Sequence, residues 1–129
     1  MPKPVIKITC PCGSGLLYQD CCEPYHLSLG APNAEKLMRS RYSAYVLGLE
    51  EYLLNTWHPN SRPKHLKLSN DHTQWLNLQV ISFEPNDDHA TVEFIATYRD
   101  LGKAEKLHEK SHFRRIAGRW YYVEGTFLD

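Results

Sequence analysis

Apolar residues recur along this chain with two different periods, which divide it into a helical part and a strand part. Between residues 34 and 49 they fall at i, i+4, i+7 and i+8 spacing, which is typical of an amphipathic helix. The apolar stripe consists of Leu37, Met38, Tyr42, Tyr45, Val46 and Leu49. The other side of this helix carries Arg39, Ser40 and Ser43. Asn33 is a suitable N-cap and Gly48 a suitable left-handed end, so we expect the helix to begin at Ala34 and end near Gly48.

A second, shorter helix is predicted from about Glu50 to Thr56. Two glutamates lie in its first turn, where the helix dipole favours negative charge. The pair His58-Pro59 ends it, because a residue before proline resists helical geometry. Residues 60–70 are polar and rich in turn formers, and residues 71–74 are expected to form one helical turn.

From residue 76 onward the period becomes two, which is typical of β-strands. Strands are predicted at about 76–81, 90–99, 107–116 and 119–126, and the second has the cleanest alternation. In the first, Leu76, Leu78 and Val80 are expected on one face. Turns are predicted at 85–88 and 101–103 and at Ala117-Gly118, which suits a tight hairpin. Helices followed by a four-stranded meander predict an α+β fold with the helices on one face of an antiparallel sheet.

Composition sets limits on this picture. The 129 residues have the length of one ordinary domain, and 42% hydrophobic with 23% charged residues is typical of a soluble globular protein. No run of 18 apolar residues suggests a membrane span. A formal net charge of zero makes nucleic acid an unlikely partner. Residues 68–98 lack Lys and Arg, whereas residues 99–119 are mainly basic, so we expect opposite charges to face each other across neighbouring strands.

The four cysteines of the chain are concentrated near its start, at Cys10, Cys12, Cys21 and Cys22. Two thiolate pairs separated by a glycine-containing turn are suited to one tetrahedral Zn²⁺. Gly13 and Gly15 provide the backbone freedom that such a wrap requires. Because four thiolates leave no coordination position for water, the sequence predicts a structural zinc ion rather than a catalytic one.

Disulfide bonding is the alternative for these four thiols. Bridges between Cys10 and Cys12 or between Cys21 and Cys22 would be strained small rings, and the remaining pattern needs two bridges side by side. No signal-peptide pattern precedes the cluster, so we expect a cytoplasmic, reducing environment, which favours metal. His26 is close enough in sequence to replace one thiolate.

The stretch from Cys10 to Cys22 resembles the SEC-C zinc motif, named for the C-terminus of the SecA translocation ATPase. Residues 37–45, 56–59 and 119–125 are similar to the YchJ family, bacterial proteins known chiefly as uncharacterised. The resemblance implies a zinc-binding segment at 1–28 and, at 29–129, a cone-like α+β domain similar to nuclear transport factor two, with a cavity between a curved antiparallel sheet and N-terminal helices. SEC-C motifs often end in Cys-His, whereas this one ends in Cys21-Cys22, so the ligand set carried over is four thiolates.

Candidate chemistry in that cavity centres on Glu109 and Ser111, which share a strand face with Leu107 and Phe113. Six further candidates for its lining are Tyr42, Tyr45, Trp57, His58, Trp120 and Tyr122. The simpler interpretation is that Glu109 forms an ion pair with Arg39 or Arg41 from the first helix. Those arginines are about 200° apart around the helix, so we expect one to face inward and the other solvent. His108 and His112 share a strand face but are interpreted as surface residues rather than metal ligands.

Two functions from different classes follow. The leading prediction is a zinc-binding protein-interaction module, not an enzyme, in which the metal fixes a loop exposing Leu16, Leu17 and Tyr18. The resemblance to the SecA motif implies a protein partner of the secretion- or ribosome-associated kind. The alternative is an enzyme or small-ligand binder that uses the cavity, with Glu109, His58 and Tyr42 as its catalytic groups. Relatives on this fold often dimerise through the open face of the sheet, and the sequence leaves a homodimer open.

Overall fold

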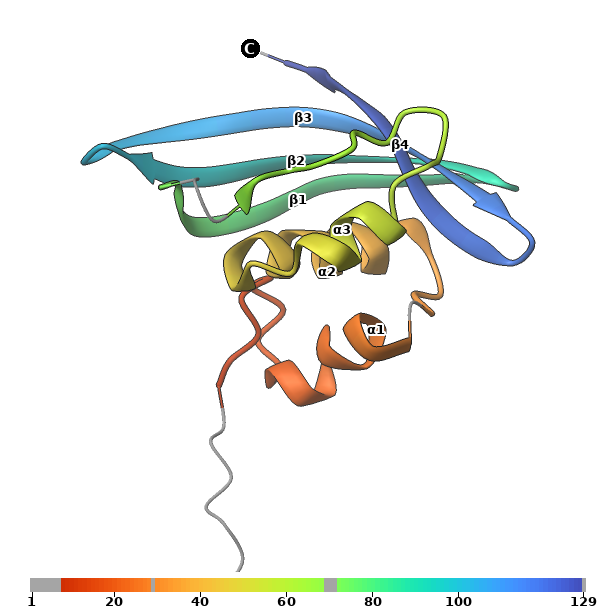
Figure 1. Ribbon diagram of the computed structural model, residues 1–129, viewed down its shortest axis with the longest axis horizontal. Helices are drawn as coiled ribbons and strands as arrows, with labels where there is room; N and C mark the ends of the chain where they lie inside the picture. Colours follow the sequence, from red (N-terminus) through yellow and green to blue (C-terminus); the bar gives the residue numbers. More distant parts are fainter. Residues whose placement is uncertain (1–7, 29, 69–71, 129) are drawn as a thin grey trace, which may run out of the picture.

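The computed structural model describes residues 8–28, 30–68 and 72–128. Four antiparallel strands form one sheet in the order β1-β2-β3-β4. They are β1 (Gln74–Asn86), β2 (His89–Asp100), β3 (Lys103–Ile116) and β4 (Arg119–Phe127). The helices α1 (Glu23–Ser28), α2 (Ala34–Leu47) and α3 (Glu50–Asn55) all lie on one side of the sheet (Figure 1). The α+β class and the order of elements predicted from the sequence are therefore confirmed.

Each pair of neighbouring strands is joined by a two-residue turn, because the paired ends are Asn86 with His89, Asp100 with Lys103 and Ile116 with Arg119. At the last turn Ala117 and Gly118 have φ values of 52° and 80°. Positive φ at both central positions defines the turn type that matches the twist of a hairpin. The prediction of a tight hairpin at these two residues is confirmed.

Irregularities of register bend the sheet. β1 carries one extra residue between Trp75 and Asn77 and another between Val80 and Ser82, relative to β2. A bulge of this kind increases the local twist and turns the following side chains. Leu76 and Ile81 are the extra residues, and 41% and 45% of their surfaces remain exposed. The expectation that Leu76 shares a buried face with Leu78 was wrong for this reason.

α2 begins and ends as its sequence predicts. The Asn33 side chain accepts a hydrogen bond from the Lys36 amide at 2.8 Å, and Gly48 closes the helix with a φ of 75°. The helix is nevertheless buried on two sides, because the sheet covers Met38 and Tyr42 while the cysteine segment and α3 cover Ser40 and Ser43, whose side chains are fully buried. The predicted apolar stripe is covered only in part, since 38% of the Val46 surface is exposed. α2 is therefore the central layer between the sheet and the cysteine-containing segment, which lies farthest from the sheet in Figure 1.

The segment after α3 runs along the outer edge of β4. The Tyr122 amide donates to the Thr56 carbonyl at 2.8 Å, and the His58 amide donates to the Tyr122 carbonyl at 2.7 Å. This short parallel pairing covers an edge that would otherwise expose unpaired backbone groups. Of the helical turn predicted at 71–74, residue 71 lies outside the described residues. The prediction was wrong at 72–74, where the chain is extended and enters β1 at Gln74.

Acidic and basic side chains meet across the strands as expected. His108 on β3 contacts Glu93 on β2 at 2.8 Å, and Arg115 contacts Asp88 at 2.9 Å. His112 is exposed and does not join His108 in a cluster. None of the helices among the described residues combines the length and the apolar character that a membrane span requires.

Candidate metal centre and ligand cavity

The four cysteines converge on one buried point beneath α2. Their sulfur atoms all lie within 4.8 Å of one another, and the side chains of Cys10, Cys12, Cys21 and Cys22 are all buried. The Cys12 and Cys21 sulfurs are 3.6 Å apart, and those of Cys21 and Cys22 are 3.9 Å apart. Sulfurs about 2.3 Å from a tetrahedral metal ion lie about 3.8 Å from each other, whereas a disulfide bond is about 2.05 Å long. The thiols are free, and their spacing is that of a metal site.

Local backbone structure produces this convergence. The chain folds back between Ile8 and Tyr18, where the Cys10 amide donates to the Leu16 carbonyl and the Tyr18 amide to the Ile8 carbonyl, both at 2.9 Å. Gly13, with a φ of 80°, makes the turn that aligns the first pair of cysteines. The second pair follows a single 3-10 turn, η1 (Tyr18–Asp20), and directly precedes α1.

Hydroxyl groups surround the sulfurs. Ser14 Oγ lies 3.1 Å from Cys21 Sγ, and Ser43 Oγ of α2 lies 3.5 Å from Cys10 Sγ. The thiols also titrate against one another. Hydrogen bonds from Cys10 and Cys22 lower the pKa of Cys12, while those to Cys10 and Cys12, together with burial, raise the pKa of Cys22. Protein groups alone thus stabilise one thiolate at the expense of its neighbours, and four thiolates require a cation among them.

The ring of His26 does not point its nitrogens at the cysteine cluster as a metal ligand would. Its Nε2 lies 2.7 Å from the Ser40 carbonyl oxygen, and its Nδ1 lies 2.6 Å from the Tyr18 hydroxyl. Since a carbonyl only accepts, Nε2 must carry a proton, and in the neutral ring Nδ1 then accepts from Tyr18. Both ring nitrogens are thereby used, so of the two alternatives left open by the sequence His26 is adjacent to the cysteines rather than a ligand in place of one of them. The histidine instead ties the cysteine segment to α2.

This arrangement predicts a neutral His26 with its proton on Nε2 at pH 7. Burial lowers its pKa below the ordinary 6.5, so the unfolded chain takes up this proton before the folded protein does. Stability from the neutral ring is therefore present above pH 6.5 and is lost as the pH falls below it. Long-range ¹H–¹⁵N NMR of the ring reports the tautomer and the midpoint directly. A midpoint above 6.5, or a proton on Nδ1, would contradict the prediction.

A cavity of about 220 Å³ lies on the opposite side of α2, between this helix and the concave face of the sheet. Thirteen residues line it, and most of them are aromatic or aliphatic. They are Met38, Arg41, Tyr42, Tyr45, Trp57, Trp75, Phe94, Ala96, Leu107, Glu109, Ser111, Phe113 and Tyr122. Eight of these residues are buried, and five are half-buried: Tyr45, Trp57, Trp75, Leu107 and Tyr122.

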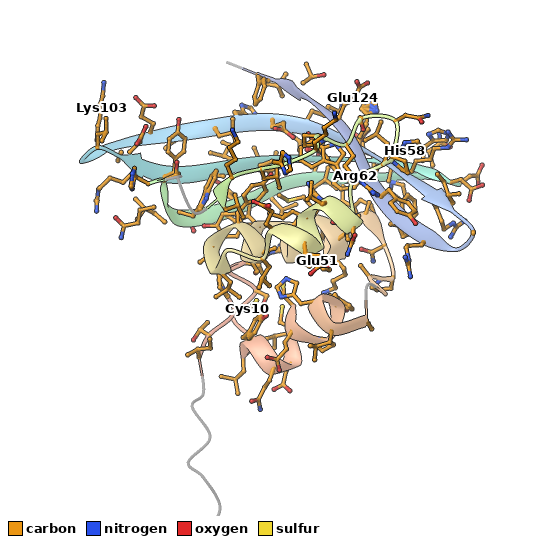
Figure 2. All side chains as sticks on the ribbon, in the orientation of Figure 1. Cys10, Glu51, His58, Arg62, Lys103 and Glu124 are labelled. Atoms are coloured by element: carbon orange, nitrogen blue, oxygen red, sulfur yellow. The ribbon has the colours of Figure 1, made fainter. Side chains whose placement is uncertain are left out.

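Two residues expected in this cavity are elsewhere. The His58 side chain lies at one end of the sheet with Glu124 and Arg62, far from the Lys103 end (Figure 2). Its backbone pairs with β4, and adjacent residues of an extended segment point to opposite sides, so Trp57 faces the cavity and His58 does not. Trp120 is buried near the β3–β4 turn, where the Arg115 guanidinium carbon lies 5.5 Å from its ring centre.

Glu109 is the acidic group of the cavity, and only 7% of its surface is exposed. Ser111 and Tyr122 both donate hydrogen bonds to its Oε2, the latter at 3.4 Å. The expected ion pair with an arginine was wrong, because the ion pairs of the described residues include neither Arg39 nor Arg41 with Glu109. The hydroxyls of two strands take the place of that arginine.

Arg41 faces inward, as expected of one of the two helix arginines, and is 5% exposed. Its Nη1 donates to the Leu53 carbonyl at 2.8 Å and to the Thr56 hydroxyl at 2.7 Å. Its guanidinium carbon lies 5.0 Å from the Trp57 ring centre and 4.7 Å from that of Tyr122. The group therefore connects α2, the segment after α3 and β4.

Arg39 is not free in solvent. It donates to the Cys12 carbonyl at 3.1 Å and pairs with Glu35, so it holds the cysteine segment on the other side of α2.

Gly125 is a functional position that the sequence did not reveal. It pairs with Ser111 across β3 and β4, and a Cβ at this position would overlap the carboxyl group of Glu109. The strand thus lacks a side chain at the place where the glutamate lies. A glycine inside a strand pattern does signal close approach of another group, and this is the sign that could have found it.

Replacing Gly125 with Ala is therefore expected to displace the Glu109 carboxyl group and to cost about 1–3 kcal/mol of stability through overpacking. The Glu109→Ala, Gly125→Ala double variant removes the overlap, so the effects of the two substitutions should not add. Urea unfolding of the four proteins of this cycle measures the coupling. Additive free energies would contradict the proposed close approach.

Residues 8–22 form a cysteine knuckle that packs on α2, and α2 in turn packs on a curved sheet with an internal cavity. These features define a class of protein in which a SEC-C segment precedes a domain similar to nuclear transport factor two. Sequence comparison identifies both parts. Residues 9–24 match the SEC-C motif, and residues 33–125 match the middle, nuclear-transport-factor-two-like domain of YchJ. The chain belongs to the YchJ-like UPF0225 family.

Its relatives are similar along nearly their whole length. A UPF0225 protein of Bordetella parapertussis is 50% identical over 126 residues, which cover 95% of each chain. One from Chromobacterium violaceum is 49% identical and covers 95% of this chain and 96% of its own. The solution structure of a SEC-C motif containing protein from Rhodopseudomonas palustris is 37% identical, with a TM-score of 0.83 over 95% of this chain and all of the other. A crystal structure of a second such protein, from Psychrobacter arcticus, is 34% identical, with a TM-score of 0.77 over 93% and 82%.

Proposed function

We propose that this protein binds a small organic ligand in the cavity between α2 and the sheet, and that a structural Zn²⁺ held by Cys10, Cys12, Cys21 and Cys22 braces the far side of α2. The observation that carries the proposal is the buried carboxyl group of Glu109. It faces an aromatic cavity without an ionic partner among the described residues, and Gly125 leaves space for it. A mainly apolar cavity with a few convergent polar groups is the usual form of a ligand site.

Zinc is the metal best suited to the cysteine cluster. Four thiolates in a closed tetrahedral set are typical of structural zinc, and they leave no position for substrate or water. The buried cysteines belong to the same hydrophobic core as Leu37, Met38 and Tyr42 of α2. When bound, the metal would fix the segment that covers α2, and so would hold one wall of the cavity in place.

Binding of a neutral aromatic molecule such as toluene tests the cavity. We expect toluene to shift the NMR signals of Met38, Leu107 and Phe113 and to do so saturably. Ala96→Leu, which fills the cavity from β2, should abolish the shifts, whereas Ala104→Leu on exposed β3 should preserve them. Folding of both variants is checked by their amide spectra. A folded Ala96→Leu protein that binds toluene as well as the unmodified protein would overturn the proposal.

As a second function, we propose that a protein partner docks on the knuckle. Leu16 supports it, since 50% of its surface is exposed, whereas Leu17 and Tyr18 are half-buried and Tyr18 packs against the core. Leu16→Ser should therefore reduce capture of a partner from bacterial lysate without loss of zinc. Unchanged capture would remove this surface from the function.

A further inference from the structure

The chemistry of the ligand can be inferred from the two charged residues that line the cavity, provided that the cavity is a ligand site as proposed above. In the described part of the chain, both hydrogen bonds of Glu109 end on Oε2, and both hydrogen bonds of Arg41 start from Nη1. The carboxyl Oε1 and the guanidinium Nη2 therefore keep capacity for another partner.

These two atoms are not sealed inside the protein. Among the described residues, the only side-chain polar atom that is both sealed from solvent and without a hydrogen-bond partner is Trp57 Nε1. Glu109 Oε1 and Arg41 Nη2 have no hydrogen-bond partner among the described residues and are not in that sealed class, so each keeps some accessible surface. Because the two residues are only 7% and 5% exposed and both line the cavity, we assign this small accessible surface to the cavity.

The cavity is thus lined by an acidic hydrogen-bond acceptor, Glu109, and a basic hydrogen-bond donor, Arg41, which do not form an ion pair with each other. Tyr122 separates them, with the Arg41 guanidinium over its ring and its hydroxyl directed to Glu109. A ligand with a single positive charge would be repelled by Arg41, and a ligand with a single negative charge by Glu109. A ligand that carries both charges satisfies both groups and places its remaining atoms against the aromatic walls.

We propose that the ligand is a small zwitterion with an apolar body, of the α-amino acid class, with its ammonium group at Glu109 and its carboxylate at Arg41. The cavity of about 220 Å³ is small for a ligand site, which limits the body to one aromatic or branched aliphatic group. The aromatic walls fit such a body, and their ring faces also favour the ammonium group.

Two matched series of molecules test this inference by calorimetry or NMR titration. L-Phenylalanine is compared with phenethylamine and 3-phenylpropionate, and L-leucine with 3-methylbutylamine and 4-methylpentanoate. Within each series the members share the apolar body and differ in charge. We expect at least one of the two amino acids to bind at least 10-fold more tightly than both of its singly charged analogues.

The Glu109→Gln variant keeps the shape of the side chain and removes its charge. It should weaken amino acid binding at least 10-fold and should not weaken binding of the acid analogue, whereas Glu124→Gln on the exposed face of β4 should change neither. An analogue that binds as tightly as its amino acid overturns the zwitterion assignment. Binding of toluene without binding of either amino acid also overturns it but leaves the cavity as a ligand site. Failure of every probe overturns both proposals.

Discussion

Removal of the metal from the reduced protein is expected to lower its melting temperature by roughly 15 °C. Zinc binds short cysteine-containing segments with about 10–16 kcal/mol, far more than so few residues gain from their own packing. Here the four cysteine residues are at most 7% exposed and belong to the same core as residues of α2, so the loss is expected to spread beyond the knuckle. Even a net loss of about 4 kcal/mol corresponds to a shift of this size for a chain of this length.

Circular dichroism with and without a strong chelator measures this shift, and elemental analysis measures the zinc content. Cys12→Ser removes the most deeply buried sulfur and should reproduce the effect of the chelator. Ser14→Ala is the matched control, because Ser14 touches Cys21 without being a metal ligand, and it should cost at most about 1 kcal/mol. One equivalent of zinc is expected. Metal-free protein with four alkylated thiols and an unchanged melting temperature would contradict the site.

Acid should act in the same direction as the chelator. Protons compete with zinc for the thiolates, so metal affinity falls as the pH falls. The neutral His26 ring, which bridges Tyr18 and Ser40, also becomes protonated as the pH falls. Burial lowers its pKa, so this happens below pH 6.5. Protonated His26 still donates from Nε2 to Ser40 but no longer accepts from Tyr18, so acid is expected to weaken the hydrogen bond of the cysteine segment to His26 as well as metal binding.

The features that local sequence determines were predicted well. The caps at Asn33 and Gly48, the alternation of β2 and the turn at Ala117-Gly118 each depend on residues close together in the chain. The clustering of the four cysteines follows from their spacing and from Gly13. The inward direction of Glu109 and Ser111 follows from the period of a strand.

The features that were missed depend on contacts between distant segments. Ser40 and Ser43 are polar and yet fully buried, because the knuckle and α3 cover the side of α2 that the sheet leaves open. The bulges of β1 turn Leu76 outward. The sequence of one strand does not determine its register with the neighbouring strand, so these bulges could not be predicted. The role of Gly125 becomes visible only when β4 lies beside Glu109 on β3.

The sequence allowed an ion pair between Arg41 and Glu109. In the structure Arg41 instead contacts α3, the segment after it and two aromatic rings. Burial acts to lower the pKa of this guanidinium, but arginine remains charged, so its environment must compensate the charge. The Leu53 carbonyl, the Thr56 hydroxyl and the faces of two aromatic rings provide that compensation. Glu109 adds a favourable electrostatic contribution without direct contact.

Arg41→Met is therefore expected to destabilise the protein by about 3 kcal/mol, or roughly 10 °C, although methionine fills much of the same space. Hydrogen bonds to a charged group contribute about 1.5–3 kcal/mol each, and desolvated contacts with aromatic faces about 2 kcal/mol, from which the cost of burying the charge is subtracted. Arg41→Lys should recover less than half of the loss, because an ammonium group lacks the planar shape that packs against both the Trp57 and the Tyr122 ring while donating to the Leu53 carbonyl of α3.

Arg39→Met is the comparison that separates this role from a general effect of charge on α2. Arg39 is half-buried and contacts Glu35 and the Cys12 carbonyl, so its loss should cost about 1 kcal/mol and should affect the knuckle rather than the cavity. Urea unfolding gives the two free energies, and the NMR signals of the Trp57 indole report whether the stack has been lost. If Arg41→Met costs no more than Arg39→Met and leaves those signals in place, Arg41 does not join helix to sheet, and the charge that we assign to the cavity wall has another function.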